Sequence, residues 1–523
     1  MPRKKSAKTE AKQVQVRAVI FLGASAISMM VAETRKGQSR VLDVLSQPIN
    51  LAQDVFTLGN VTRETMDRCV QIARGFNDLL AEYRLAGEVQ VRLLATNILQ
   101  NIHNLDTLVN RLQIACGLHL EVMDNGEMTR LLYMGLQSTL DRRPDLQKKR
   151  LLVLHLGPGN TRLFVYDKER ITYYANYRMG AHRTGIAIGD VETGGADSET
   201  ALIREHIRGT VEQVLYDLES ALPSNPDALV IYGPDFHLPR SPLAVGDHVT
   251  VDGLTKLAHD IARTPMNRRV ERYHEDYAGV YALLPAVVTY QTLARAITPD
   301  SILCPPEEYE QSFLLNLLPA TEEDSALEDE VIHFSQLLAD RYRTDRGHSR
   351  HIRKLCMSLF DQLKELHGLT RHDRLLLKVA AILHEVGTFI SPRGHHHHSQ
   401  YIILNSEIFG LSRLDSEVVG LLARYHRHGA PSEEDRSYME LSLTDRLRVQ
   451  KLSALLRVAE AMERAHSHRV SEFTVRFNNR RLELLVPGVH DLTLENMALR
   501  SKGCLFSDIF GYDITLLPVQ AAK

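Results

Sequence analysis

Histidine and glutamate side chains gather in one stretch of the chain, AAILHEVGTFISPRGHHHHSQYIILNSE, which runs from Ala380 to Glu407. His384 and Glu385 form a pair, and four consecutive histidines, residues 395–398, follow in the same stretch. Neutral imidazole and carboxylate groups are ligands that suit Zn²⁺, Mn²⁺ or Fe²⁺ in proteins. The stretch lies inside a helical pattern, so its histidines either bind a metal ion, join helices through buried hydrogen bonds, or form a solvated helix start.

Two other segments share a plan that suits phosphate binding. Each has an apolar strand, a turn with glycine and small residues, and a second strand; they are AVIFLGASAISMMVAE and LLVLHLGPGNTRLFVYD. Glycine permits a close backbone approach, so such a turn can present N–H groups to a phosphate. One hairpin of this kind is common. Two copies in one chain favour a pair of related halves that bind a phosphate or a nucleotide.

The composition is that of an ordinary globular protein. The 523 residues are 44% hydrophobic and 24% charged, which allows roughly three or four domains. A formal net charge of -3 gives no global basic field, so we expect no specific nucleic-acid partner, although a local groove for a polyanion is compatible with it. The five cysteines lack paired spacing, and no signal-peptide core follows the basic opening. We expect a cytoplasmic protein without a membrane span.

Four regions succeed one another along the chain. Residues 1–15 are basic and polar and predict a disordered tail. Residues 16–319 alternate β-rich apolar runs with helical stretches, which predicts an α/β region. Residues 320–470 repeat apolar side chains at three- and four-residue spacing, which predicts an all-helical domain. Residues 471–523 alternate again and predict a small α+β C-terminal module.

Several longer segments carry a resemblance to a known family. They are VLDVLSQPINLAQDVFTLGNVTRETMDRCVQIARGFNDLLAEY, LATNILQNIHNLDTLVNRLQIACGLHLEVMDNGEMTRLLYMGL, LLPAVVTYQTLARAIT and ISPRGHHHHSQYIILNSEIFGLS. From Arg17 to about Pro518 the chain resembles the exopolyphosphatase / guanosine pentaphosphate phosphohydrolase (Ppx/GppA) family. The resemblance implies an α/β, actin-like (ASKHA, RNase H-like) duplicated core, with subdomain I at 16–130 and subdomain II at 131–319. A helical HD-type domain would follow this core.

The acidic residues of the family's phosphate hairpins are missing from this chain. Phe21 and His155 stand where the two family hairpins carry an aspartate, and Arg162 stands where the second carries a glutamate. The family glutamate that activates the attacking water corresponds to Met128, with Glu127 beside it. Phenylalanine cannot bind Mg²⁺ and methionine cannot accept a proton. The cleft is therefore predicted to bind phosphate but to be poorly equipped to hydrolyse it.

The resemblance still assigns glycines, hydroxyl groups, an amide and an arginine to phosphate binding. These residues are Gly23, Ser25, Thr96, Arg130, Gly157, Gly159, Asn160 and Thr161. Glu127 is the remaining candidate for the catalytic base, provided that its turn shifts by one residue. Pro158 replaces a family glycine, Asn97 and Gln100 replace a serine and an arginine, and a later glycine turn survives only around Gly233.

In the helical domain, by contrast, the same resemblance implies a complete set of metal ligands. HD-type domains bind metal through a histidine at a helix start, a His-Asp pair on a second helix and an acid on a later one. The corresponding residues here are His348, His384, Glu385, His396, His426 and Glu460, with His398 as the alternative to His396. Such a set suits Zn²⁺, Mn²⁺ or Fe²⁺. A buried hydrogen-bond network that joins the helices through the same histidines is the other interpretation.

Three functions remain open at this point. The first is the family activity, release of terminal phosphate from inorganic polyphosphate or guanosine pentaphosphate with Mg²⁺, which the resemblance assigns to a homodimer. In the second, the histidine site of the helical domain hydrolyses a phosphate ester or a nucleotide. In the third, the altered cleft binds a phosphorylated ligand as a regulator without turning it over.

Overall fold

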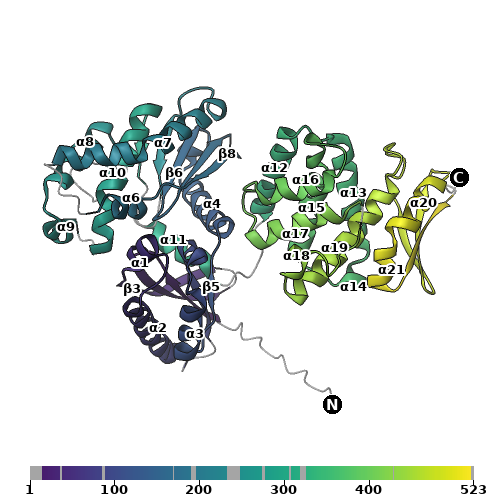
Figure 1. Cartoon of the computed structure of the whole chain (residues 1–523), viewed down its shortest axis with the longest axis horizontal. Helices are drawn as coiled ribbons and strands as arrows, with labels where there is room; N and C mark the ends of the chain where they lie inside the picture. Colours follow the sequence, from purple (N-terminus) through teal and green to yellow (C-terminus); the bar gives the residue numbers. More distant parts are fainter. Residues whose placement is uncertain are drawn as a thin grey trace, which may run out of the picture. The chain divides into compact units, whose positions relative to one another are not determined.

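The chain folds into two compact units, residues 1–323 and 324–523 (Figure 1). The computed structural model describes residues 15–35, 38–84, 89–168, 170–189, 196–232, 248–273, 277–304, 308–318, 325–427 and 429–519. Residues 1–14 of the predicted tail and the glycine turn around Gly233 lie outside these ranges.

The first half of unit 1 is a five-stranded mixed sheet in the order β3-β2-β1-β4-β5. Its strands are β1 (Gln15–Leu22), β2 (Ala26–Arg35), β3 (Gln38–Pro48), β4 (Val89–Ala95) and β5 (Leu120–Val122). Its helices are α1 (Leu51–Leu58), α2 (Arg63–Arg84), η1 (Asn97–Asn101) and α3 (Leu105–Cys116). Apolar residues of β1 and β4, among them Ile20 and Leu93, form one core with Phe76 of α2 and Leu108 of α3.

The second half of unit 1 repeats this plan in a six-stranded sheet of order β10-β11-β9-β6-β7-β8. Its strands are β6 (Leu151–Leu156), β7 (Thr161–Asp167), β8 (Arg170–Tyr177), β9 (Ala228–Ile231), β10 (His248–Val249) and β11 (Ile302–Leu303). In both sheets three strands joined antiparallel are followed by a strand parallel to the first, β4 beside β1 and β9 beside β6. This repeat confirms the predicted duplicated α/β core.

Helices pack around the second sheet and between it and the first. They are α4 (Asn125–Asp141), α5 (Pro144–Gln147), α6 (Ala181–Ile188), α7 (Ala196–Ala221), α8 (Val251–Arg263), α9 (Met266–Tyr273), α10 (Tyr277–Ile297) and α11 (Glu308–Leu317). The segment 279–297 of α10 is long and apolar enough to cross a membrane, but 78% of it is buried. α10 packs against α6, α7 and α8, which is the environment of a core helix.

Unit 2 begins with a bundle of helices, as the three- and four-residue spacing predicted. These are α12 (Ser325–Arg341), α13 (Arg346–Gln362), α14 (Lys364–His367), α15 (Arg371–Leu383), η2 (Val386–Phe389), α16 (His395–Leu404), α17 (Arg413–Tyr425), α18 (Arg436–Met439) and α19 (Leu443–Met462). The segment 452–462 of α19 is buried throughout, as expected for a central helix. Helices α13, α15 and α17 pack around it (Figure 1).

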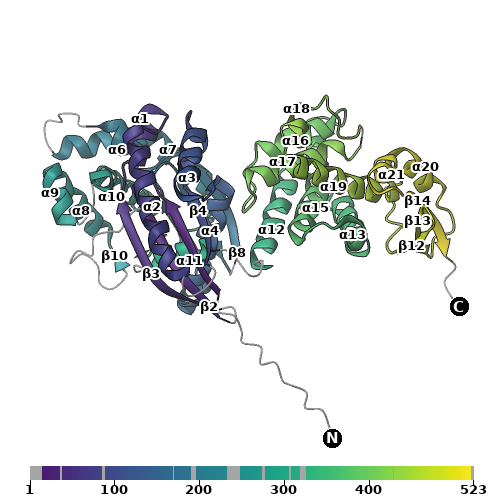
Figure 2. The same cartoon turned by 90° about the horizontal axis from the view of Figure 1, so that it is seen from below.

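A small sheet with two helices completes unit 2 (Figure 2). Its strands are β12 (Thr474–Asn478), β13 (Arg481–Pro487) and β14 (Asp513–Val519), in that order in the sheet. Its helices are α20 (Thr493–Lys502) and α21 (Cys504–Phe510), and both pack against α19. The contact brings the end of α20 to the centre of the bundle.

Because α6 packs closely on α10, a methyl group added at Gly185 of α6 should strongly lower the free energy of unfolding. A Cβ atom on Gly185 would overlap the carbonyl oxygen of Tyr281, a backbone atom that cannot move aside. We expect Gly185→Ala to lower the free energy of unfolding by about 1–3 kcal/mol, measured by urea denaturation. Gly209 of α7 has open space around it, so Gly209→Ala is the matched control and should stabilise by roughly 0.5–1 kcal/mol. Equal effects of the two variants would contradict the packing.

A buried histidine of the same helix predicts a pH dependence. His182 is 1% exposed, neither of its ring nitrogens has a hydrogen-bond partner among the described residues, and burial lowers the pKa of His182 to about 4. The unfolded chain takes up this proton near pH 6.5 and the folded chain does not. The contribution of His182 to the free energy of unfolding is therefore fully present above pH 6.5. It falls by about 3 kcal/mol as the pH drops to 4.

His182→Leu should remove that part of the slope, measured as the urea midpoint between pH 4 and pH 7. His119→Leu, at an exposed position of unit 1, is the control. An unchanged slope in His182→Leu would show that the folded protein accepts this proton.

Candidate functional site

The turns of the two predicted phosphate hairpins line one cavity in unit 1. Its walls come from the β1–β2 turn, η1, α4, the β6–β7 turn and α11. The lining residues are Phe21, Gly23, Ala24, Thr96, Asn97, Met128, His155, Pro158, Arg162 and Phe313. The duplicated hairpins thus meet at one place.

An aromatic pair lines part of this cavity. The rings of Phe21 and Phe313 pack edge to face with centroids 5.2 Å apart. The cavity volume is about 20 Å³. Phe313 comes from α11, and nothing in its sequence position indicated that it reaches the hairpins.

Asn125, the first residue of α4, gathers the polar side chains beside the cavity. Its Oδ1 accepts hydrogen bonds from Nδ2 of Asn97 at 2.6 Å, from Nη2 of Arg162 at 3.1 Å and from Nδ2 of Asn160 at 3.4 Å. Asn125 carried no signal in the sequence, because an asparagine at a helix start is ordinarily a local feature. Here it connects residues from both halves of unit 1.

Arg162 is a buried cation without an acidic partner among the described residues. It is 2% exposed, its Nε has no hydrogen-bond partner in the described chain, and the partner found for Nη2 is the neutral amide of Asn125. A buried charge is costly unless it is paired. The guanidinium is therefore arranged to receive an anion, and its planar fork suits phosphate oxygens.

His155 lines the same cavity as a neutral imidazole. It is 2% exposed, and neither ring nitrogen has a hydrogen-bond partner in the described part of the chain. Burial, and secondly the positive charge of Arg162, hold the pKa of His155 well below its ordinary value. The ring is therefore neutral at neutral pH, with a proton on one nitrogen and a lone pair that can accept a proton on the other.

Glu127, the candidate base, is occupied in capping its own helix. Its Oε2 accepts a hydrogen bond from the backbone N–H of Asp124 at 2.8 Å, and its backbone N–H donates to Oδ1 of Asp124 at 2.8 Å. This reciprocal pair is a capping box, which starts α4. Glu127 is exposed and does not line the cavity, whereas Met128 does. The structure therefore does not bring Glu127 to the cleft.

The other predicted phosphate residues divide into two groups. Gly23 and Thr96 line the cavity, and Asn160 reaches it through Asn125. The remaining residues are absent from its lining: Ser25, Arg130, Gly157, Gly159 and Thr161. The hydroxyl of Thr161 donates to the carbonyl of Met179, and the N–H of Gly157 closes its own turn on the carbonyl of Asn160 at 2.9 Å.

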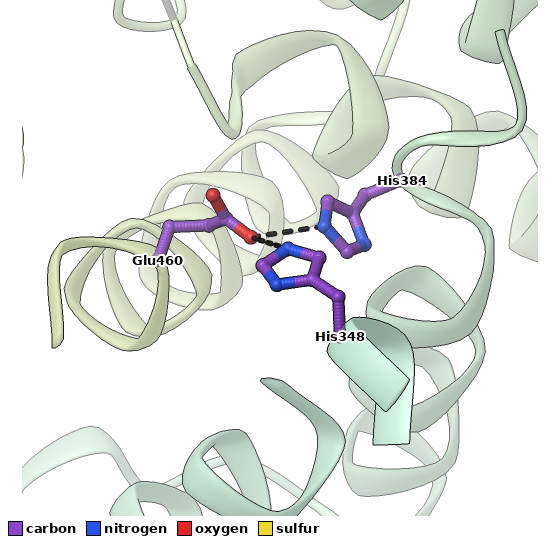
Figure 3. A group of neighbouring side chains, drawn as sticks. All are labelled: His348, His384 and Glu460. Atoms are coloured by element: carbon purple, nitrogen blue, oxygen red, sulfur yellow. Dashed lines mark ion pairs between the residues drawn. The ribbon is translucent and has the colours of Figure 1, made fainter. Parts of the chain in front are cut away.

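In unit 2, three predicted metal ligands converge on one point (Figure 3). His348 lies on α13, His384 directly follows α15, and Glu460 lies on α19. Oε1 of Glu460 is 2.9 Å from Nε2 of His384 and 3.3 Å from Nε2 of His348. All three side chains are buried.

The orientation of these groups fits a metal ion. Nε2 of both histidines and Oε1 of Glu460 are buried without a hydrogen bond of acceptable geometry in the described chain, although they lie close together. Ligand atoms about 2 Å from a tetrahedral Zn²⁺ are roughly 3.3 Å apart, close to the separations found here. Imidazole and carboxylate ligands suit Zn²⁺, Mn²⁺ or Fe²⁺.

Surrounding charges hold the carboxylate of Glu460 ionised. Its second oxygen, Oε2, is 3.3 Å from Nζ of Lys502 at the end of α20. Burial alone would raise the pKa of Glu460, but His384, His348 and Lys502 outweigh it and keep this pKa well below its ordinary value. Glu385 stands at the edge of the group, with Oε2 3.9 Å from Nε2 of His348. Lys502 belongs to no sequence motif, so its position beside Glu460 could not be predicted from the sequence.

The four-histidine run contributes His395, rather than His396, to this region. Nε2 of His395 is 3.2 Å from Nε2 of His426, and the ring of His426 packs 5.0 Å from that of His384. His396 is half-buried, and its ring packs at a tilt on that of His397, with ring centroids 4.2 Å apart. The sequence cannot tell which of the four identical histidines lies near His426. The start of α16 directly after Gly394 determines it.

Comparisons with known proteins cover both units. A family model described as Ppx/GppA phosphatase family matches residues 30–225, and one described as Ppx/GppA phosphatase, domain III, matches residues 334–502. The chain is 20% identical to a guanosine-5'-triphosphate,3'-diphosphate pyrophosphatase of Pseudoalteromonas translucida, over 86% of this chain and 87% of the relative. The protein of the same name from Aeromonas hydrophila is 21% identical, over 77% of this chain and 79% of the relative.

Two solved structures resemble part of the chain. An exopolyphosphatase from Cytophaga hutchinsonii has 16% identity and a TM-score of 0.48, over 58% of this chain and 97% of that structure. The Ppx/GppA family member of Aquifex aeolicus has 15% identity and a TM-score of 0.44, over 58% of this chain and 98% of that structure. The two family models together span most of the sequence, in the expected order. The chain belongs to the Ppx/GppA phosphatase family.

Proposed function

We propose that this protein hydrolyses a terminal phosphoanhydride bond of inorganic polyphosphate or guanosine pentaphosphate. The observation that carries the proposal is the buried guanidinium of Arg162, which lines the cavity between the two hairpins and has no acidic partner among the described residues. A phosphate chain is the partner that such a group lacks, because its oxygens accept paired hydrogen bonds from a guanidinium. The related proteins named guanosine-5'-triphosphate,3'-diphosphate pyrophosphatase support the same substrate class.

The cleft would bind and orient the terminal phosphate with Arg162 and with the amides of Asn97 and Asn160. His155 is the group of the lining that can accept the proton of an attacking water. Its low pKa makes it a weak base, so we expect a rate about 10²–10⁴-fold below that of a site with a well-matched base. The lining contains no carboxylate, so these residues do not fit a protein-bound Mg²⁺.

A second candidate function is metal-dependent phosphate hydrolysis in unit 2. The converging, otherwise unpartnered ligand atoms of His348, His384 and Glu460 favour it. His348, His384 and Glu460 would hold the ion, which when bound would supply a nucleophile by lowering the pKa of water. Lys502 orients the carboxylate through its second oxygen, as groups behind metal ligands commonly do.

Phosphate release from polyphosphate and guanosine pentaphosphate, with Mg²⁺ or Mn²⁺, tests the first function. We expect Arg162→Met to reduce kcat/KM about 10- to 100-fold, because a hydrogen bond from a charged group contributes about 1.5–3 kcal/mol. Arg150→Met is the matched control, since Arg150 pairs with Asp167 at 3.2 Å on the same hairpin and does not line the cavity.

The variant His384→Ala separates the two candidates. Turnover that survives His384→Ala and falls in Arg162→Met assigns catalysis to unit 1. The reverse pattern assigns it to unit 2 and overturns the first proposal. No turnover in the wild type, with polyphosphate binding that Arg162→Met removes, would instead identify a phosphate-binding protein.

Metal addition should stabilise unit 2. We expect Zn²⁺ or Mn²⁺ at about 100 times its Kd to raise the free energy of unfolding by about 2.7 kcal/mol, because the ligands meet only in the folded chain. Differential scanning calorimetry of metal-loaded and chelator-treated protein measures this, and Glu460→Gln should reduce the gain. His372→Ala is the control, since His372 pairs with Asp415 at 2.7 Å outside the group. Equal stabilisation of Glu460→Gln and the wild type would argue for a hydrogen-bond network.

A further inference from the structure

A second group of two histidines and a glutamate lies beside the first. It consists of His351 on α13, Glu463 directly after α19, and His468 in the following loop. His351 follows His348 by three residues on one face of α13. Glu463 follows Glu460 by three residues, at the C-cap of α19. The rise between such residues is about 4.5 Å. The two groups therefore occupy neighbouring levels of the same helix pair.

The ligand atoms of the second group also converge. Oε2 of Glu463 is 3.1 Å from Nε2 of His351, and Oε1 is 3.4 Å from Nδ1 of His468. The three offered ligand atoms lie within 4.8 Å of one another. Nε2 of His351 is buried and makes no hydrogen bond of acceptable geometry to the described residues. The Glu463 side chain is only 1% exposed, so its charge is held beside the two imidazoles.

The loop after α19 is bent so that its histidines face both groups. His466 and His468 have φ values of 48° and 54°, a left-handed conformation that costs energy for residues other than glycine. The ring of His466 stacks on His348 with centroids 4.4 Å apart, and the backbone N–H of His468 donates to Oε1 of Glu463 at 2.8 Å. Residues in an unfavourable backbone conformation are held there by contacts with the rest of the structure. Here these are the contacts of His466 with His348 and of His468 with Glu463.

We infer that His351, Glu463 and His468 bind a transition-metal ion of the Zn²⁺ or Mn²⁺ class. Two imidazoles and one carboxylate leave coordination positions for water or for an oxygen of a ligand. The His468 side chain is 47% exposed, so this site opens to solvent, whereas the first group is buried. The inference goes beyond the proposed function, because it concerns metal binding and holds whichever substrate the protein hydrolyses.

Metal stoichiometry tests the inference on the full-length protein. Metal-free protein would be loaded with Zn²⁺ and desalted, and bound zinc would be measured by mass spectrometry. We expect two ions per wild-type chain, one in His468→Ala, one in His384→Ala and none in the double variant. His468 is partly exposed, so its replacement leaves the core intact. Glu463→Gln, which keeps the side-chain shape, should also retain one ion.

The control addresses the four-histidine run, which could bind zinc by itself. A His397→Ala/His398→Ala variant should still bind two ions, because neither residue belongs to a converging group in the described chain. Co²⁺ loading gives a second readout, since the visible absorption of the second site should disappear in His468→Ala and persist in His384→Ala. Unchanged stoichiometry in both His468→Ala and Glu463→Gln would overturn the inference, as would loss of the second ion in the His397/His398 control.

Discussion

The buried carboxylate of Glu460 is the interaction on which the helical part of the protein depends. It lies on the central helix α19, and its two oxygens face His348, His384 and Lys502, which come from α13, the end of α15 and α20. A charge removed from water has to be surrounded by groups that compensate it. Segments far apart in the sequence must therefore meet at one point, and this requirement limits how the helices can pack around α19.

Unit 1 has the opposite arrangement, with a buried cation and no nearby acid among the described residues. Phe21, His155, Met128 and Arg162 stand where the resemblance places family acids. Arg162 lines the cavity and donates to the amide oxygen of Asn125 beside it. These replacements exchange carboxylates, which could bind a metal ion, for uncharged or cationic side chains. The positive charge of Arg162 is therefore not neutralised by an acid of these positions. The described lining of the cavity thus offers a guanidinium, an imidazole and amide or hydroxyl groups, and none of its residues is a carboxylate.

Hydrophobic periodicity predicted the types of element well. The spacing of apolar residues along α13, α15 and α19 and the apolar run of β6 depend on local geometry, which the sequence carries directly. The duplicated glycine hairpins predicted two related halves, and the shared strand order of the two sheets confirmed them. His348, His384 and Glu460 were selected through the family resemblance, and the structure brings these three together.

The sequence by itself determined the order of helices and strands, the repeat of the hairpins and the loss of acids from them. Tertiary structure alone decided that Glu127 caps its own helix, that His395 instead of His396 meets His426, and that Phe313 packs on Phe21 in the lining of the cavity. It also decided that Lys502 pairs with Glu460. The physical reason is that residue types and periodicity are properties of neighbouring residues, whereas the direction of a side chain and its distant partners depend on how complete elements pack.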